Sequence, residues 1–487
     1  MDSNYLTQAI LECEEVLETK SENPETWQTA FRNLGNFLQG TGQFERAIVW
    51  HSLALEQQPS LAEIYCQLGE LYIAEELWSE ALKAFENALE HQPNSVQIYA
   101  NLAQIHGRLQ QREAEMDCWY RATQINPELV NPKGYYKLAK AFEQKGKIEE
   151  AISCYQRASK SKELFVIANY DLGEIYLRQR KLELAEATYQ KVAVVAPNEA
   201  KSQYKLGTIY LQRQNFEKAI ECFRQTIQNA PDFPFAYRDL VKTFLKLKKW
   251  DEAIATCYGI LNLVEEYPWV YVQLGNALRG KGRIAEAAAN FQKACQVRGW
   301  EECVERDYFF TQDIFSYRIP LWETHLKFLF DLSEIKILEI GSYEGMSACW
   351  FLDRILTHTG DRLTCIEKKF HPKLRENIVK TGAESKVDLL EGDVSQFLDA
   401  LAPDSFDAIN MQDKHKTADV ARENAASTWK ALKTGGVVVF NDYGWRNPRY
   451  PEQNPQQGID SFLNSIQEQW ELVHKNHSAF QLIVRKI

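Results

Sequence analysis

The sequence predicts two kinds of structure in one chain: an α-solenoid, followed by an α/β domain with a doubly wound, mostly parallel sheet. A 34-residue period runs through about the first three hundred residues, and beyond it short apolar runs alternate with amphipathic stretches. The length of 487 residues also exceeds that of one ordinary domain, roughly 100–200 residues. We expect a capping helix over residues 1–27, the solenoid over 28–297 and the sheet domain over 298–487.

The repeat is marked by a leucine that in most copies precedes a small residue. The spacing is 34 residues at every step but one, where two residues are added, and the positions are Leu34, Leu68, Leu102, Leu138, Leu172, Leu206, Leu240 and Leu274. Thirteen residues after each leucine stands an alanine in every copy but one, and four residues further on a bulky side chain stands in most copies. This spacing predicts two amphipathic helices per repeat, with small residues where the helices approach each other.

The pattern resembles the tetratricopeptide repeat, in about eight copies. The resemblance implies a superhelical array whose concave groove binds a protein or peptide partner. We find no ladder of Lys, Arg or Asn that would name the chemistry of that partner.

Composition and charge exclude several classes of protein. The net charge is −11, and both parts of the chain are mildly acidic, which disfavours a nucleic-acid partner. No apolar run reaches the roughly 18 residues of a membrane span, and the N-terminus has no signal-peptide pattern. The ten cysteines are scattered with no C-x-x-C spacing. We expect a cytoplasmic protein, and the even charge favours a neutral small-molecule substrate.

The second part alternates strands and helices. Strands are predicted at 336–341, 362–367, 387–393, 406–411, 437–443 and 479–487, and helices at 346–360, 373–382, 394–402, 418–436 and 459–470. This order favours a doubly wound parallel sheet, which binds its ligand beyond the carboxyl ends of the strands.

The strand ends carry the unusual residues. Gly341 and Gly345 follow the first strand, Glu339 precedes them, and Glu367 ends the second strand. A dinucleotide-dependent oxidoreductase would also show glycines and a later acid, but the loop is G-x-x-x-G rather than G-x-G-x-x-G. The glycine loop, Glu339 and the Gly-Gly pair before the fifth strand resemble class I S-adenosylmethionine-dependent methyltransferases, in particular bacterial small-molecule O-methyltransferases.

The resemblance assigns a role to each strand end. It places the methionine part of S-adenosylmethionine at the glycine loop, the ribose at the second strand and the adenine near the third. The residues implied in binding the cofactor are Glu339, Gly341, Ser342, Tyr343, Gly345, Glu367, Asp393 and Gln412. Asp393 could equally cap the following helix.

His415 and Asp442 would face the acceptor. His415 is the natural base because imidazole titrates near neutrality, and Asp442 could orient it or the acceptor hydroxyl. Related metal-dependent enzymes carry more acids at the fourth and fifth strand ends. Here Gln412 and Asn441 replace acids, so we expect no metal. His474 and His477 are interpreted as loop residues, and residues 445–458 as a lid or an inert loop.

The main hypothesis is therefore an S-adenosylmethionine-dependent methyltransferase. It would methylate an oxygen of a small-molecule or glycan-type acceptor, while the repeats recruit a protein partner or carrier. The rival hypothesis is a non-catalytic scaffold whose methyltransferase-like domain is degenerate.

Overall fold

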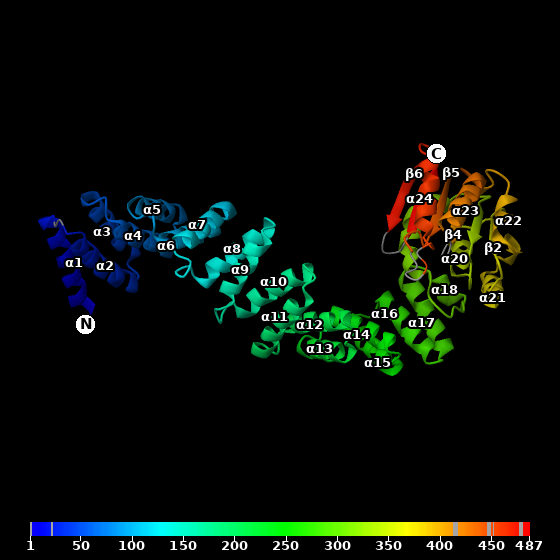
Figure 1. The fold of residues 1–487 in the computed structure, drawn as a ribbon, viewed down its shortest axis with the longest axis horizontal. Helices are drawn as coiled ribbons and strands as arrows, with labels where there is room; N and C mark the ends of the chain where they lie inside the picture. The colour runs from blue at the N-terminus through cyan, green and yellow to red at the C-terminus, as the bar shows by residue number, and fades with distance from the viewer. Residues whose placement is uncertain (1, 21–22, 413–416, 446–449, 451, 477–480) are drawn as a thin grey trace. The chain divides into compact units, whose positions relative to one another are not determined.

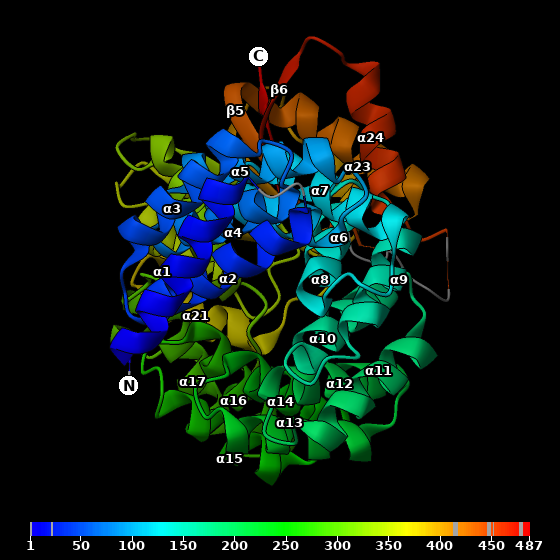
Figure 2. The ribbon, with the colours of Figure 1, turned by 90° about the vertical axis from the view of Figure 1, so that its left-hand side faces the viewer.

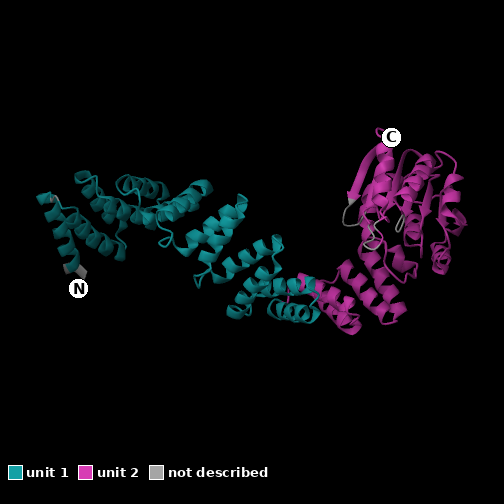
Figure 3. Cartoon of the chain, in the orientation of Figure 1, with its two compact units in different colours: residues 1–230 teal, residues 231–487 magenta. Residues whose placement is uncertain are grey.

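The chain forms two compact units, residues 1–230 and 231–487 (Figure 3). The computed structural model describes residues 2–20, 23–412, 417–445, 450, 452–476 and 481–487. The division falls between two repeats, so the second unit holds the last repeats together with the sheet. The predicted domain boundaries near residues 27 and 298 stay a prediction.

The first unit consists of antiparallel helix pairs, as Figures 1 and 2 show. Its helices are α1 (Asp2–Thr19), α2 (Pro24–Gly40), α3 (Phe44–Gln57), α4 (Ala62–Ala74), α5 (Trp78–His91), α6 (Val96–Arg108), α7 (Arg112–Ile125), α8 (Pro132–Gln144), α9 (Ile148–Ala158), α10 (Phe165–Arg178), α11 (Leu182–Val195), α12 (Ala200–Gln212) and α13 (Phe216–Asn229). The second helix of a pair also contacts the first helix of the next pair, which produces a continuous helical array and confirms the predicted solenoid.

A glycine and an aromatic ring explain how the two helices of a repeat pack. A Cβ added to Gly69 in α4 would lie 2.5 Å from Cε2 of Phe85 in α5. Only glycine leaves room for that ring. In the first repeat, His51 takes the place of the ring opposite Gly35, and the imidazole is completely buried. The small residues of the repeat therefore serve helix contact, as expected.

The second unit begins with helix pairs and continues into the sheet (Figure 1). Its helical elements before the sheet are α14 (Pro234–Lys246), α15 (Trp250–Leu261), α16 (Pro268–Gly280), α17 (Ile284–Val297), α18 (Glu302–Glu305), the 3₁₀ turn at Ser316–Arg318, α19 (Ile319–His325) and the 3₁₀ turn at Lys327–Leu329. We call residues 300–330 the lead-in segment, because this chain leads from α17 to the first strand.

The sheet alternates strands and helices as predicted. The elements are β1 (Lys336–Ile340), α20 (Met346–Arg354), β2 (Arg362–Glu367), α21 (Pro372–Thr381), a 3₁₀ turn at Glu384–Lys386, β3 (Val387–Glu391), α22 (Val394–Asp399), β4 (Phe406–Gln412), α23 (Ala418–Ala431), β5 (Leu432–Asn441), α24 (Pro455–Ser465), β6 (Trp470–Asn476) and β7 (Gln481–Lys486). The strand order is β3-β2-β1-β4-β5-β7-β6, and β7 is antiparallel to both of its neighbours. The chain order reverses between β1 and β4, where a ligand is expected.

Two predictions about this sheet are wrong in detail. Residues 470–476 form the edge strand β6, so His474 lies in a strand and not in a loop; His477 lies outside the described residues. The Gly-Gly pair does not precede the fifth strand. It lies inside β5, where Gly435 has φ +81° and the register with β4 shifts.

Apolar side chains cover both faces of the sheet. One face packs against α20, α21 and the lead-in segment, and the other packs against α22, α23 and α24. Cys295 of α17 belongs to the first of these cores, so the last repeat shares its interior with the sheet. Among the described residues, no helix combines the length and apolarity needed to cross a bilayer.

Candidate active site

The glycine loop is a tight turn between β1 and α20. Gly341 has φ +88° and Gly345 has φ +89°. A Cβ on Gly341 would lie 3.1 Å from Cβ of Gln412, and one on Gly345 would lie 2.7 Å from Cδ1 of Leu374. Tyr343 between them also has positive φ, at +49°. The turn therefore needs glycine at both ends, and it brings the ends of β1 and β4 together.

Glu367 closes this turn. Its Oε2 accepts a hydrogen bond of 2.8 Å from the backbone N–H of Ser342. Partial burial raises the pKa of Glu367, while the N–H groups of Ser342 and Tyr343 oppose that rise. Glu367, the residue predicted to bind the ribose, is thus in direct contact with the glycine loop, which is predicted to bind the methionine part.

A row of buried amides crosses the sheet below the strand ends. The side-chain amide of Gln481 donates to Asn441, Asn441 donates to Asn410, and Asn410 donates to Oε1 of Glu339 at 2.8 Å. These four side chains come from β7, β5, β4 and β1, and all are at most 1% exposed. Burial raises the pKa of Glu339, and the hydrogen bond from Asn410 opposes that rise.

Asn441 therefore has a structural use that the sequence did not reveal. We interpreted it as a replaced acid at the acceptor side, but the side chain points into the sheet and bonds its neighbours. Within the described residues, no group of three or more His, Cys, Asp or Glu side chains could hold a metal.

The remaining predicted residues lie at the expected edge but differ in use. Asp393 is exposed and caps α22, where Oδ1 accepts from the N–H groups of Ser395 at 2.9 Å and Gln396 at 3.4 Å. Gln412 lies against Gly341, and Asp442 is half-buried with φ +57°. His415 and part of the 445–458 loop lie outside the described residues.

Glu344 is a site residue that sequence reasoning missed. It is 1% exposed, and its carboxylate accepts from the backbone N–H of Thr311 at 2.7 Å and from its hydroxyl at 2.6 Å. Asn377 of α21 donates to the backbone oxygens of Glu344 and Phe309. These bonds tie the lead-in segment to the glycine loop. The only signal in the sequence was an acid between Tyr343 and Gly345 in the loop.

Asp353 joins the lead-in segment to α20. Its side chain is 1% exposed, and it accepts from Nε1 of Trp300 at 2.9 Å and from the hydroxyl of Tyr308 at 2.9 Å. Nε of Arg306 lies 3.3 Å from its Oδ1. Burial raises the pKa of Asp353 from 3.8 to about 6.

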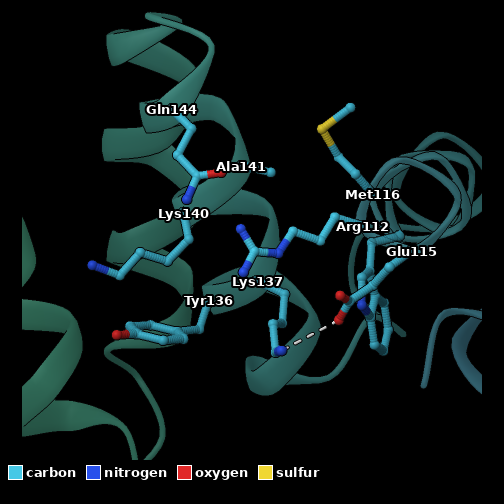
Figure 4. A pocket seen from close by; sticks show the side chains of 9 residues that line it. Arg112, Glu115, Met116, Tyr136, Lys137, Lys140, Ala141 and Gln144 are labelled. Carbon is cyan, nitrogen blue, oxygen red and sulfur yellow. Dashed lines mark ion pairs between the residues drawn. The ribbon is translucent and has the colours of Figure 1, made fainter. Parts of the chain in front are cut away.

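The first unit holds two adjoining cavities of about 290 and 560 Å³ on helices α6 to α8. Figure 4 shows the smaller one, where side chains of α7 and α8 face each other and Lys137 pairs with Glu115 at 3.4 Å. Five of the six charged side chains in the two linings are basic: Arg108, Arg112, Lys133, Lys137 and Lys140. The repeats thus carry a local basic cluster, although the sequence showed no ladder.

Comparison with known families agrees with both parts. A model described as a methyltransferase domain matches residues 338–443, and tetratricopeptide-repeat models match residues 62–95, 136–200, 200–233 and 270–299. No curated protein matches the chain.

Solved structures match the repeats. The structure of YrrB, described as a TPR protein with an unusual peptide-binding site, is 21% identical with a TM-score of 0.28, over 47% of this chain and 96% of that one. The C-terminal part of a repeat protein from Cytophaga hutchinsonii is 17% identical with a TM-score of 0.38, over 47% and 92%. A MamA fragment from Desulfovibrio magneticus RS-1 is 20% identical with a TM-score of 0.30, over 35% and 93%. By its family matches, the chain is a tetratricopeptide-repeat solenoid fused to a methyltransferase-like domain.

Proposed function

We propose that the sheet domain is an S-adenosylmethionine-dependent methyltransferase that methylates an oxygen of a small-molecule or glycan-type acceptor. The observation that carries this proposal is the glycine turn, whose Ser342 N–H is held by Glu367 at the switch point of the sheet. The methyltransferase-domain match supports the reaction class. The methyl donor, the acceptor atom and catalytic turnover are what we propose beyond that match.

The residues present fit this cofactor. Gly341 and Gly345 leave little room for a Cβ, because Gln412 and Leu374 lie against them, so the backbone of the turn is held in a fixed conformation. Glu339, Gly341, Ser342, Tyr343 and Gly345 would hold the amino-acid part, Glu367 the ribose, and Gln412 would line the same space. Asp393 is the weakest candidate, because its carboxylate already caps α22. When bound, S-adenosylmethionine supplies an electrophilic methyl group on a sulfonium centre.

The chain's own task is then to orient the acceptor and remove its proton. In this proposal Asp442, which directly follows β5, orients the acceptor hydroxyl, and His415 is the base. Alignment of the two reacting groups provides much of the rate in such transfers, and general base catalysis contributes typically 10²–10⁴-fold.

Calorimetry with S-adenosylhomocysteine tests the cofactor site. Gly341→Ala should weaken binding at least about tenfold, because the new Cβ would press on Gln412. Gly382→Ala is the matched control: its φ is +70°, so the backbone strain is similar, but a Cβ there meets nothing within 4 Å. Equal affinity in the two variants, or absence of binding in the wild type, would refute the proposal.

A specific observation favours the scaffold as a second candidate. Asn441 is used inside the amide row and Gln412 is not an acid, so the acceptor side lacks two charges of its metal-dependent relatives. Binding of S-adenosylhomocysteine without methyl transfer to a broad panel of hydroxylated acceptors would support the scaffold.

For the repeats, we propose that the basic cluster on α6 to α8 binds an acidic segment of a protein partner. Trp119, which lines both cavities, is 3% exposed and its Nε1 has no hydrogen-bond partner among the described residues. A glutamate-rich synthetic peptide should bind with an affinity that falls as salt rises. Lys137→Gln should weaken it, whereas Lys201→Gln, at an exposed position of α12, should not. Equal binding by both variants would contradict this assignment.

A further inference from the structure

Arg318 of the lead-in segment is a buried cation that lacks an acidic partner. The residue is 5% exposed, and Phe315 and Ile319, close to it in sequence, are buried as well. In the part of the chain that the structure describes, its guanidinium forms no ion pair, and its one hydrogen bond runs from Nε to the hydroxyl of Tyr317 at 2.9 Å. Arginine is almost never this buried unless its charge is paired.

The two terminal nitrogens of Arg318 have no hydrogen-bond partner among the described residues. They are not among the polar atoms sealed in the interior without a partner, so they reach solvent through the small exposed part of the residue. The guanidinium also stacks on Tyr317, with Cζ 5.1 Å from the ring centroid. Stacking and the bond from Nε fix the orientation of the planar fork, and such a fork matches the two oxygens of a carboxylate or phosphate.

Tyr317 adds a third donor. Its hydroxyl accepts the bond from Arg318 and therefore keeps its own proton, which has no acceptor among the described residues. Tyr317 as a whole residue is 45% exposed, so part of it is open to a ligand. Burial raises the pKa of Tyr317, Arg318 opposes that rise, and the charge of Asp442 adds to it, so Asp442 is near enough to act on the hydroxyl. Asp313 also acts on Tyr317, but its carboxylate is bonded to Ser316.

We propose that Arg318 and Tyr317 form a subsite for an anionic oxygen group, a carboxylate or a phosphate, carried by the methyl acceptor. This inference rests on the proposed function, which places the acceptor beside Asp442. It replaces our expectation of a neutral acceptor, because the even charge of the whole chain says nothing about one buried cation. An acceptor bound in this way would present its hydroxyl to Asp442 while its anionic group stays on Arg318.

The test uses the full chain and two probes, inorganic phosphate and acetate, titrated at constant ionic strength in a calorimeter. One probe should bind the wild type, and the stronger of the two identifies the anion as phosphate or carboxylate. Arg318→Met should weaken that binding at least tenfold, and Tyr317→Phe should weaken it severalfold. Arg485→Met is the control: Arg485 also stacks on an aromatic ring, that of Phe328 at 5.0 Å, but it is paired with Glu471 and lies opposite Val437, several residues along β5 from Asp442.

S-adenosylhomocysteine is titrated into the same proteins. If it binds all of them and only the Arg318 and Tyr317 variants lose the anion, both proposals stand. If it binds none, the cofactor proposal fails while the anion subsite is still measured on its own. If circular dichroism shows that Arg318→Met is misfolded, the subsite is judged from Tyr317→Phe and Arg318→Lys. The lysine keeps the positive charge but lacks the planar fork, so it too should weaken anion binding. Unchanged anion affinity in these variants, or no binding of either probe to the wild type, overturns the subsite.

Discussion

Gly207 lies directly against the ring of Phe223: a Cβ added to the glycine would lie 2.6 Å from Cε1 and 2.7 Å from Cδ1. The same relationship joins Gly173 to Tyr189 and Gly275 to Phe291. Each pair links the first and second helices of one repeat, so the array depends on a contact that tolerates no added atom.

Gly207→Ala should therefore destabilise the first unit, although alanine is the better helix former by about 1 kcal/mol. Overpacking typically costs 1–3 kcal/mol, which outweighs that gain. Gly40→Ala is the control, because Gly40 also lies in a helix and a Cβ there meets nothing within 4 Å. Urea unfolding followed by circular dichroism measures both. A stabilised Gly207 variant would show that Phe223 moves aside freely.

His51 should make the first repeat sensitive to acid. Burial lowers the pKa of His51, although the carbonyl of Ala47 and the side chain of Gln67 bond to the ring. Because the folded state binds the proton less well than the unfolded state, stability is complete above about pH 6.5 and is lost as the pH falls below it.

Hydrogen exchange of residues 44–57, corrected for intrinsic rates, should show less protection at pH 5 than at pH 7. His51→Phe should remove this difference, since phenylalanine occupies the equivalent place opposite Gly69. His91→Gln, at an exposed position, should retain it. Equal protection of wild-type α3 at both pH values would contradict the prediction.

Asp353 should have the opposite pH dependence in the second unit. Its pKa is raised from 3.8 to about 6, so its stabilising contribution is complete below about pH 4 and is lost as the pH rises through 6. The difference corresponds to roughly 3 kcal/mol. Segments 300–308 and 346–356 should exchange more slowly, after correction, at pH 5 than at pH 7.5. Asp353→Asn should abolish that change; if the variant keeps it, another group is responsible.

Asn441→Asp tests the amide row. The substitution removes the N–H group that donates to Asn410 and introduces a second buried carboxylate in a row that already ends at Glu339. We expect a loss of roughly 1–3 kcal/mol in stability and weaker binding of S-adenosylhomocysteine. Addition of Mg²⁺ should restore neither. Asn94→Asp, in an exposed turn, serves as the control, and an Asn441→Asp variant stabilised by Mg²⁺ would show a latent metal site.

The last repeat should be required for folding of the sheet domain. Gln292 of α17 donates to the backbone oxygen of Tyr308 at 2.5 Å, and Arg298 donates to the hydroxyl of Ser316 at 2.7 Å. Cys295 belongs to the apolar core on one face of the sheet. A fragment of residues 231–487 should unfold cooperatively, whereas one of residues 299–487 should bind a hydrophobic dye and lack a thermal transition. Equal midpoints for the two fragments would place the boundary where the repeat period ends.

The sequence predicted the features that depend on the repeat period and on the chemistry of neighbouring residues. The spacing of Leu34 and its equivalents locates the helix pairs, and the alternation after residue 330 locates most strands. The edge strand β6 was missed because "WELVHKN" alternates polar and apolar residues weakly, and only its pairing with β7 makes it a strand. Intrinsic β-propensity predicts a strand poorly where pairing with a neighbouring strand stabilises it.

The candidate site was predictable at the level of strand ends and not at the level of partners. Gly341 was predicted from the demands of a tight turn, and Glu367 from its place at the end of the second strand. The roles of Glu344 and Asn441 depend on side chains that are far away in sequence, at Thr311 and at Asn410. Arg318 was missed for the same reason: its burial depends on packing that its position in the sequence does not show.

Because Cys295 of α17 packs in the core of the sheet domain, repeats can be added to the array only upstream of the last one. A solenoid needs a capping element at each end to shield its last apolar face from water. Here α17 is shielded by the lead-in segment and the sheet, so the methyltransferase-like domain is itself the terminal cap. Whole repeats could then be gained or lost upstream of α14 by duplication without exposing an apolar end, whereas the final repeat is fixed in place by the domain that it helps to fold.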